Sequence, residues 1–129
     1  MSNNSVRQIL EARLNTEWAG RTPIYWDDIN DRPQVGVPFI RCTLDGIDSE
    51  NISIGCQRDY DLFVIQVFTP KGAGTESNFL LCDALTTMFR GYADQQLLCT
   101  KVVNERVGKS NEWYQRNVVI DTQYESYFL

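Results

Sequence analysis

The stretch from Tyr60 to Pro70, YDLFVIQVFTP, limits the possible folds of this chain more than any other, because it is the longest unbroken apolar run in the sequence. Its alternating positions are apolar on both sides, with Phe63, Ile65 and Val67 on one face and Leu62, Val64 and Phe68 on the other. A strand that is apolar on both faces is typical of the centre of a sheet covered on both sides. We therefore expect the rest of the chain to supply neighbouring strands and covering layers.

The length and hydropathy of the chain predict one soluble domain over residues 1–129. At 129 residues and 43 % hydrophobic content, the chain has the size of one ordinary domain with one core. No apolar run approaches the roughly 20 residues that a membrane helix needs. The N-terminal sequence MSNNSVRQIL lacks the basic and then apolar pattern of a signal peptide. These observations predict a soluble, cytoplasmic protein with no membrane partner.

The cysteine and histidine content argues against metal centres and against most catalytic machinery. The chain contains no histidine, and its four cysteines, Cys42, Cys56, Cys82 and Cys99, form no C-x-x-C pair. Buried free thiols in a reducing compartment are the expectation, with no disulfide and no cofactor. Without histidine, the chain cannot build a Ser-His-Asp or Cys-His system from its own residues. The missing histidine thus disfavours catalysis without excluding it.

Acidic residues are concentrated in one part of the chain. The formal net charge is −5, and the segment from Asp27 to Asp61 holds eight acids against three arginines. Affinity for DNA comes largely from lysine and arginine side chains that neutralise phosphates. We therefore expect the protein to repel DNA rather than bind it.

Two amphipathic helices are predicted from the spacing of apolar residues. The first runs from Ser5 to Trp18, where Ser5 opens a capping-box pattern and Gly20 follows as an end signal. The second begins after Thr75, a candidate N-cap, and ends near Gly91. Both helices carry an apolar stripe that needs to pack on a sheet.

Strands are predicted where apolar residues alternate or run together. Besides the central run, the predicted strands are Pro23 to Trp26, Phe39 to Leu44, Ile52 to Ile54, Leu98 to Val103 and Glu112 to Phe128. Turns are predicted at Asp45 to Asn51 and at Val107 to Asn111. Only one connection is long enough for a helical crossover. We predict an α+β fold: a two-layer sandwich in which a mixed or mostly antiparallel sheet of about four to six strands has two helices packed on one face.

Two acidic clusters are candidates for chemistry. The loop with Asp27, Asp28 and Asp31 offers oxygen ligands for a hard cation but lacks the spacing of an EF-hand, so a solvated loop is the alternative. This loop keeps open a metal-dependent ligand-binding module or enzyme, which a thermal-shift titration with calcium, magnesium or manganese would test. Asp59 and Asp61 share one face of the central run, and we interpret them as a surface pair at a strand end.

The aromatic content is high, with three tryptophans, six tyrosines and six phenylalanines. Most of these side chains are expected in the core. Trp113 and Tyr127, however, fall on the otherwise polar face of the last predicted strand. Exposed aromatic side chains of this kind are enriched at protein–protein interfaces.

Several short motifs follow one another in order along the chain. After the first amphipathic helix they are Asp31-Arg32-Pro33, Pro38-Phe39-Ile40 at the start of a strand, an acidic link, IQVFTP at Ile65 to Pro70, a helix with Leu81 and Asp83, Trp113, and a strand ending Gln123-Tyr124-Glu125. A chain with these motifs in this order resembles the tail terminator proteins of long-tailed bacteriophages. The resemblance covers nearly the whole chain and rests on the order and spacing of the motifs rather than on any one of them.

This resemblance implies a structural protein with a two-layer α/β protomer. Members of that family close into a hexameric ring on the head-proximal end of the tail tube, where they stop polymerisation of the major tail protein and present a surface to the head connector. The resemblance brings no catalytic residues, in agreement with the missing histidine, and we predict that the protein is not an enzyme. It implies a virion protein of the tail neck, assembled in the host cytoplasm, through which DNA passes without specific binding. Another neck or tail-completion protein is the alternative in the same class.

Five residues are predicted to lie at the subunit or partner interface: Asp31, Arg32, Pro33, Trp113 and Tyr127. Arg32 is expected to pair with an acid of the neighbouring subunit, and an ordinary surface ion pair of small energy is the alternative. The second apolar face of the central run needs a cover that two helices cannot supply. We expect loops of the chain and a neighbouring subunit to cover it.

Overall fold

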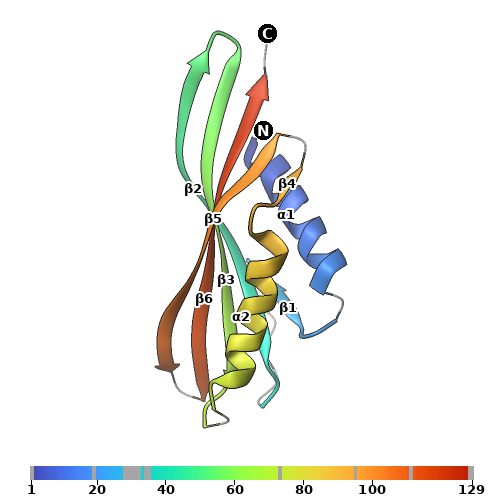
Figure 1. Cartoon of the computed structure of the whole chain (residues 1–129), viewed down its shortest axis with the longest axis vertical. Coiled ribbons are helices and arrows are strands. Elements are labelled where there is room, and N and C mark those ends of the chain that lie inside the picture. The colour runs from blue at the N-terminus through green and yellow to red at the C-terminus, as the bar shows by residue number, and fades with distance from the viewer. Residues whose placement is uncertain are drawn as a thin grey trace.

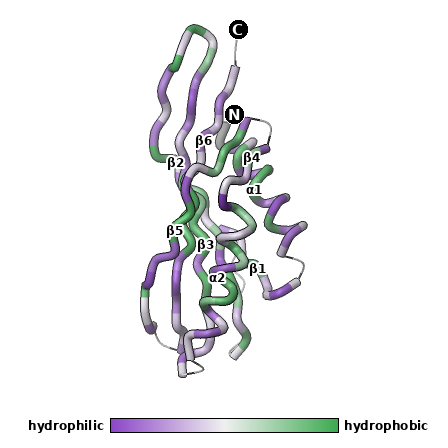
Figure 2. Tube along the Cα trace, in the orientation of Figure 1, coloured by the Kyte–Doolittle hydropathy of each residue, from purple (hydrophilic) through white to green (hydrophobic). Residues whose placement is uncertain are grey.

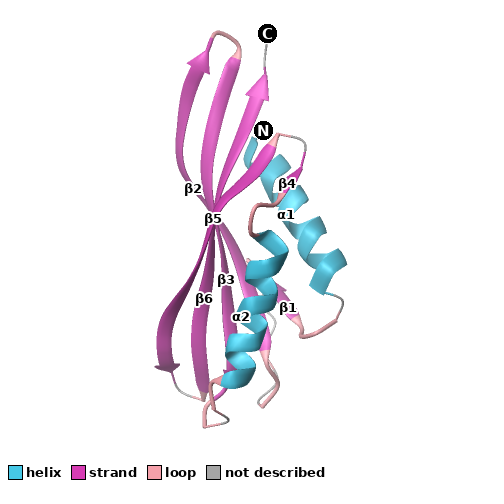
Figure 3. Cartoon of the chain, in the orientation of Figure 1, coloured by secondary structure: helices cyan, strands magenta, loops and turns pink. Residues whose placement is uncertain are grey.

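Two helices and six strands form the part of the chain that the computed structural model describes, which is residues 2–18, 20–27, 33, 36–72, 74–94, 96–110 and 112–127. The elements are α1 (Ser2–Trp18), β1 (Ile24–Trp26), β2 (Phe39–Ser53), β3 (Cys56–Pro70), α2 (Glu76–Phe89), β4 (Ala93–Asp94), β5 (Leu97–Ser110) and β6 (Trp113–Tyr127). The strands form one sheet in the order β1-β2-β3-β6-β5-β4 (Figure 3). Among the strand pairs of the described residues, β1–β2 alone is parallel and the others are antiparallel.

The sheet is strongly twisted and curls into a half-barrel, so the predicted two-layer α+β sandwich is wrong. Strands make up 56 % of the described residues. In Figure 1 the strands fan apart on both sides of a narrow waist, while α1 and α2 lie on the same side of the sheet. The reason is strand length: β2, β3 and β6 have 15 residues each, and the right-handed twist accumulates over such lengths. Bulges in β2 and β5 increase the twist further.

The two outer hairpins are longer than the sequence indicates, and both predicted turns are wrong. Residues 45–51 belong to β2, which continues to Ser53, and residues 107–110 belong to β5. The acidic segment is extended because it pairs residue by residue with β3, for example Glu50 opposite Arg58. The chain reverses at residues 54–55, where Gly55 has a φ of 78° that favours glycine. Figure 1 shows this β2–β3 hairpin extending past both helices.

The central position of β3 is confirmed. It pairs with β2 on one side and with β6 on the other along nearly its whole length. Phe63, Ile65 and Val67 are buried beneath the helices, with at most 3 % of the side chain exposed. The side chains on the opposite, convex face are half-buried: Leu62, Val64 and Phe68. This second face is therefore only partly covered within one protomer.

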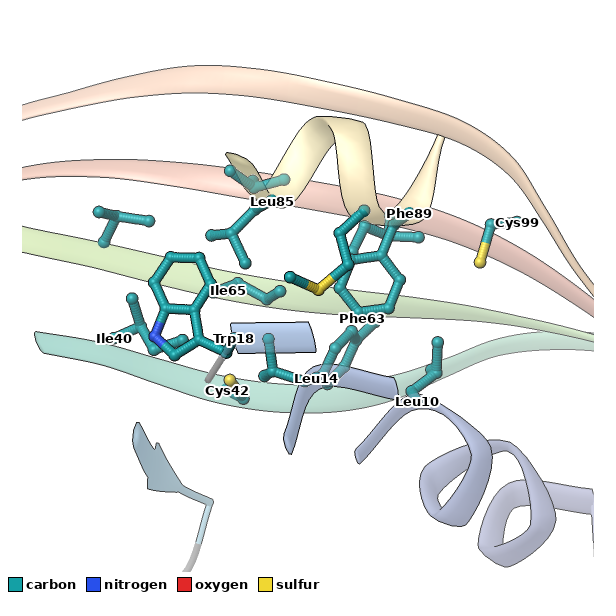
Figure 4. Close-up of a cluster of buried hydrophobic side chains, with 14 of the residues drawn as sticks. Leu10, Leu14, Trp18, Ile40, Cys42, Phe63, Ile65, Leu85, Phe89 and Cys99 are labelled. Atoms are coloured by element: carbon teal, nitrogen blue, oxygen red, sulfur yellow. The ribbon is translucent and has the colours of Figure 1, made fainter. Parts of the chain in front are cut away.

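The core lies between the helices and the inner face of the sheet (Figure 4). From α1 it receives Val6, Leu10, Leu14 and Trp18, all fully buried. The indole Nε1–H of Trp18 donates a 2.9 Å hydrogen bond to the Thr22 hydroxyl, so the largest core side chain has its polar atom satisfied. The helix begins at Ser2, three residues earlier than predicted, so Ser5 is not its cap.

The second helix has the predicted ends. Thr75 occupies the N-cap position, although its side chain makes no capping hydrogen bond. Gly91 follows the C-cap residue Arg90 with a φ of 70°. The two helices are tied together by Arg13, which donates a 2.9 Å hydrogen bond to the Met88 carbonyl and lies 4.3 Å from the centre of the Tyr92 ring.

All four cysteines are free, as predicted. Cys42, Cys82 and Cys99 are buried, whereas Cys56 is only half-buried. Burial raises the pKa of the Cys82 and Cys99 thiols to about 11. These two thiols are therefore protonated at neutral pH and unreactive.

Candidate subunit interface

Trp113 is the first residue of β6 and lies on the convex face of the sheet in a group that we call the outer aromatic cluster: Tyr25, Phe39, Phe68 and Trp113. Its ring meets Phe39 edge-on at 5.0 Å, and Phe39 stacks on Phe68 at 4.5 Å. Tyr25 closes the cluster edge-on against Phe39 at 5.4 Å. Phe39 is 3 % exposed, whereas the other three rings are half-buried. Trp113 therefore stabilises its own protomer and presents only part of its surface.

Tyr127 lies at the opposite end of β6 and is 64 % exposed. Its hydroxyl donates a 3.0 Å hydrogen bond to Oε2 of Glu125, and Nη2 of Arg58 donates one of 2.6 Å to Oε1 of the same carboxylate. The hydrogen bond from Arg58, followed by that from Tyr127, lowers the pKa of Glu125. The ring of Tyr127 is thus held in place at the surface by its hydroxyl.

The predicted interface residues do not form one patch. Trp113 and Tyr127 begin and end β6, so they are about 45 Å apart at the usual rise per strand residue. Pro33 is half-buried. Asp31 and Arg32 lie outside the described residues, and their predicted role stays a prediction. The two placed aromatic side chains mark opposite ends of the sheet.

The β2–β3 hairpin is a surface that the sequence reasoning missed. Ile47, Ile52 and Ile54 are 57 %, 44 % and 89 % exposed. Figure 2 shows an apolar hairpin tip between hydrophilic strand segments. The signal in the sequence is three isoleucines within an otherwise polar segment, at a spacing that buries none of them. Exposed aliphatic side chains grouped in this way mark an interaction surface.

Both edges of the sheet are open over long segments. Within the described residues, β1 covers β2 only at residues 40–42, and β4 covers β5 only at residues 97–98. No other described strand pairs with the β2 edge from residue 43 onward or with the β5 edge from residue 100 onward. An open edge presents rows of unpaired N–H and C=O groups that can pair with another chain.

The structure offers little support for a metal site in the part of the chain it describes. No group of three or more His, Cys, Asp or Glu residues there could hold an ion. Of the acidic loop, Asp27 is exposed at the end of β1, whereas Asp28 and Asp31 lie outside the described residues. A hollow of about 530 Å³ lies between α1 and residues Tyr92, Asp94 and Tyr124. Neither described helix is long and apolar enough to cross a membrane.

The interpretation of Asp59 and Asp61 as a surface pair is wrong. They are 3 % and 1 % exposed, on the inner face where β3 leaves the core. The Ser49 hydroxyl and the Gln57 side-chain amide donate hydrogen bonds to Asp59. Oδ2 of Asp61 has no hydrogen-bond partner within the described part of the chain. Burial, and secondly the nearby charge of Asp59, raise the pKa of Asp61 above its ordinary value of 3.8.

Asp61→Asn is expected to stabilise the protein at neutral pH. Because the pKa of Asp61 is raised in the folded state, the folded protein binds the carboxyl proton more tightly than the unfolded chain does. The free energy of unfolding therefore falls as the pH rises from the unfolded-state pKa through the raised folded-state pKa. Removing the charge should raise the free energy of unfolding by about 1 kcal/mol at pH 7 and change it little near pH 3, where the carboxyl group is protonated. Thermal unfolding at both pH values measures this, with the exposed Asp45→Asn as control. A lower melting temperature for Asp61→Asn at pH 7 would contradict the account.

Comparison with known proteins identifies a matching protein family. A family model described as "Phage tail terminator protein" matches residues 5–115. A search of curated proteins finds no significant match. One solved structure aligns with 100 % of this chain and 98 % of its own, with a TM-score of 0.68 and 21 % sequence identity, and its title states no function. At that identity the likeness shows a shared fold alone.

The family match supports a structural role for this protein in the bacteriophage tail. The matched residues include α1 from Ser5 onward, all of α2, and every described strand except most of β6. The chain belongs to the phage tail terminator family. The match confirms the resemblance to tail terminator proteins at the level of the family.

Proposed function

We propose that this protein forms a closed ring, with six copies as the expected number, at the head-proximal end of the phage tail tube. There it ends polymerisation of the major tail protein and joins the tail to the head connector. The family match over residues 5–115 carries this proposal. The open edges of β2 and β5 and the exposed isoleucines support it, because a ring protein needs surfaces that a free monomer leaves uncovered.

The proposed role is structural and not catalytic. The net charge of −5 suits a ring through which DNA slides without being gripped. No cofactor is part of the proposed role. The major tail protein and the head connector are the proposed partners. The proposed place of the mature protein is the neck of the virion, after assembly in the host cytoplasm.

Size-exclusion chromatography with light scattering tests ring formation directly. A hexamer has six times the 14.9 kDa mass of the protomer. The proposal predicts a species of that mass at assembly concentrations and a ring in negative-stain images. A protein that remains strictly monomeric at those concentrations would contradict it.

Tyr127→Ala is expected to weaken the ring while leaving the protomer folded. Tyr127 is 64 % exposed in the protomer, so the loss of its side chain removes little contact with the core. Exposed tyrosines at interfaces often contribute about one to two kcal/mol to binding, which is about tenfold in affinity. The dissociation of the ring on dilution, followed by mass photometry, measures the change. Tyr127→Phe is the matched control, since it keeps the aromatic side chain and loses only the hydrogen bond from the tyrosine hydroxyl to Glu125. An unchanged dissociation midpoint for Tyr127→Ala would exclude this residue from the interface.

A further inference from the structure

We propose that the acidic free edge of β2 in one copy lies against the basic free edge of β5 in a second copy. This inference rests on the proposed ring and names the surfaces that build it. The two edges lie at opposite ends of the strand order in one sheet, since β3 and β6 lie between β2 and β5. They are also open in the described structure, with only short cover from β1 and β4.

The β2 edge carries only acidic charge. Residues 45–53 contain Asp45, Asp48 and Glu50 and no basic residue, and all three side chains are exposed. The register places them opposite Leu62, Tyr60 and Arg58 of β3, so they share the convex face of the sheet. None of the three forms an ion pair within the described part of the chain. The Tyr60 hydroxyl donates a 2.6 Å hydrogen bond to Glu50, which leaves the negative charge of that carboxylate unbalanced.

The β5 edge is predominantly basic. Residues 101–110 contain Lys101, Arg106 and Lys109 against the single acid Glu105, and all four side chains are exposed. These three basic side chains likewise form no ion pair among the described residues. The basic charge is spread over both faces of this edge, since the register sets Lys101 opposite Asp121 and Lys109 opposite Tyr114. In a protein with a net charge of −5, an acidic edge at one end of the strand order and a basic edge at the other are complementary surfaces.

Exposed aliphatic side chains accompany the charges on both edges. Ile47 and Ile52 on β2 and Val107 on β5 are 57 %, 44 % and 49 % exposed. Each is the extra residue where the pairing register skips a position, which is a β-bulge. Bulges interrupt an edge and limit how far two sheets can pair through their backbones. The contact is therefore made mainly by side chains, with aliphatic groups next to charges of opposite sign.

The charge pattern selects a head-to-tail arrangement. Two β2 edges placed together would bring acid against acid, and two β5 edges would bring base against base, so a two-fold dimer through either edge is disfavoured. An acidic edge against a basic edge leaves one edge of each kind free on every pair. Repeating that contact adds further copies until the chain of protomers closes. A second copy of this protein is thus the occupant that the two edges fit.

Two complementary charge-reversed variants test the inference. The first is Asp48→Lys with Glu50→Lys, which makes both edges basic, and the second is Lys101→Glu with Lys109→Glu, which makes the β5 edge predominantly acidic. Each alone is expected to lose at least a hundredfold in assembly affinity. Mixed in equal amounts they should assemble again, because each altered edge then meets a partner of opposite charge in an alternating ring. Native mass spectrometry would show equal numbers of the two variants in that ring.

The control and the outcomes separate this inference from the proposed function. Glu76→Lys with Asp83→Lys changes the net charge as much as the first variant but on exposed positions of α2, and it should assemble like the natural protein. Circular dichroism verifies that each variant is folded, and Asp48→Asn with Glu50→Gln gives a milder test with a smaller loss. If the natural protein is monomeric, the ring itself fails. If it forms rings but the separate variants do too, or the mixture does not, the edge contact is overturned and the edges face another partner, such as the major tail protein.

Discussion

Trp18→Ala is expected to lower the free energy of unfolding by about 3 to 5 kcal/mol, the largest effect of any single substitution considered. Trp18 is the largest fully buried side chain and closes the core between the end of α1 and the sheet. Its loss leaves a cavity and also frees the Thr22 hydroxyl from the indole N–H. The melting temperature should fall by about 10 to 20 °C. Urea unfolding followed by circular dichroism measures the free energy.

The matched control for this prediction is Trp18→Phe, which keeps an aromatic ring and loses the hydrogen bond and part of the volume. It should cost clearly less than the alanine variant. Ala12 lies on the exposed side of the same helix, and Ala12→Ser should change stability by less than about 0.5 kcal/mol. A Trp18→Ala protein as stable as the natural one would show that the core is not built as described.

Asn78→Ala is expected to destabilise the protein by about 2 to 3 kcal/mol. The Asn78 side chain is fully buried in the first turn of α2. The two N–H groups of its Nδ2 are shared among three acceptors: the Val67 carbonyl at 3.2 Å, the Thr69 hydroxyl at 3.1 Å and the Tyr114 carbonyl at 3.2 Å. The amide therefore fastens the start of α2 to both β3 and β6. Equilibrium unfolding of the variant measures what this connection contributes.

Asn78→Asp separates loss of the donors from loss of volume. The carboxylate has nearly the same shape, but it places an oxygen where the amide N–H₂ faces two carbonyls, so it should destabilise at least as much as alanine. Ser77→Ala, on the exposed side of the same turn, should have almost no effect. If Asn78→Asp were as stable as the natural protein at neutral pH, the hydrogen bonds of this side chain would not be what holds the helix.

The sequence predicted the structure best where the spacing of apolar residues matches the side chains that the fold buries. The Tyr60 to Pro70 run is central because its apolar residues leave no other place for it. The second helix ends at Phe89, just before Gly91, because the chain adopts a positive φ at that glycine. The sharp twist of the sheet was missed because it depends on strand length and bulges, which a short window of residues does not reveal.

Polar residues account for the remaining differences. The acidic segment of β2 was interpreted as a turn because charged residues favour loops, yet its side chains are exposed on a protruding hairpin where charge costs little. Asn78 was passed over because a polar residue in the first helical turn is common, and its burial follows only from tertiary packing. Trp113 was expected to be exposed, but Phe39 and Phe68 cover part of it.

Electron microscopy of tail tubes tests the central proposal, that this protein caps the tube, most directly. Tubes would be polymerised from the major tail protein of the same phage, with the natural protein or with the Asp48→Lys, Glu50→Lys variant. The account predicts a ring at one end of each tube and an end to lengthening with the natural protein, and neither with the folded variant. Tubes that keep growing, with no density at either end in the presence of the natural protein, would contradict it.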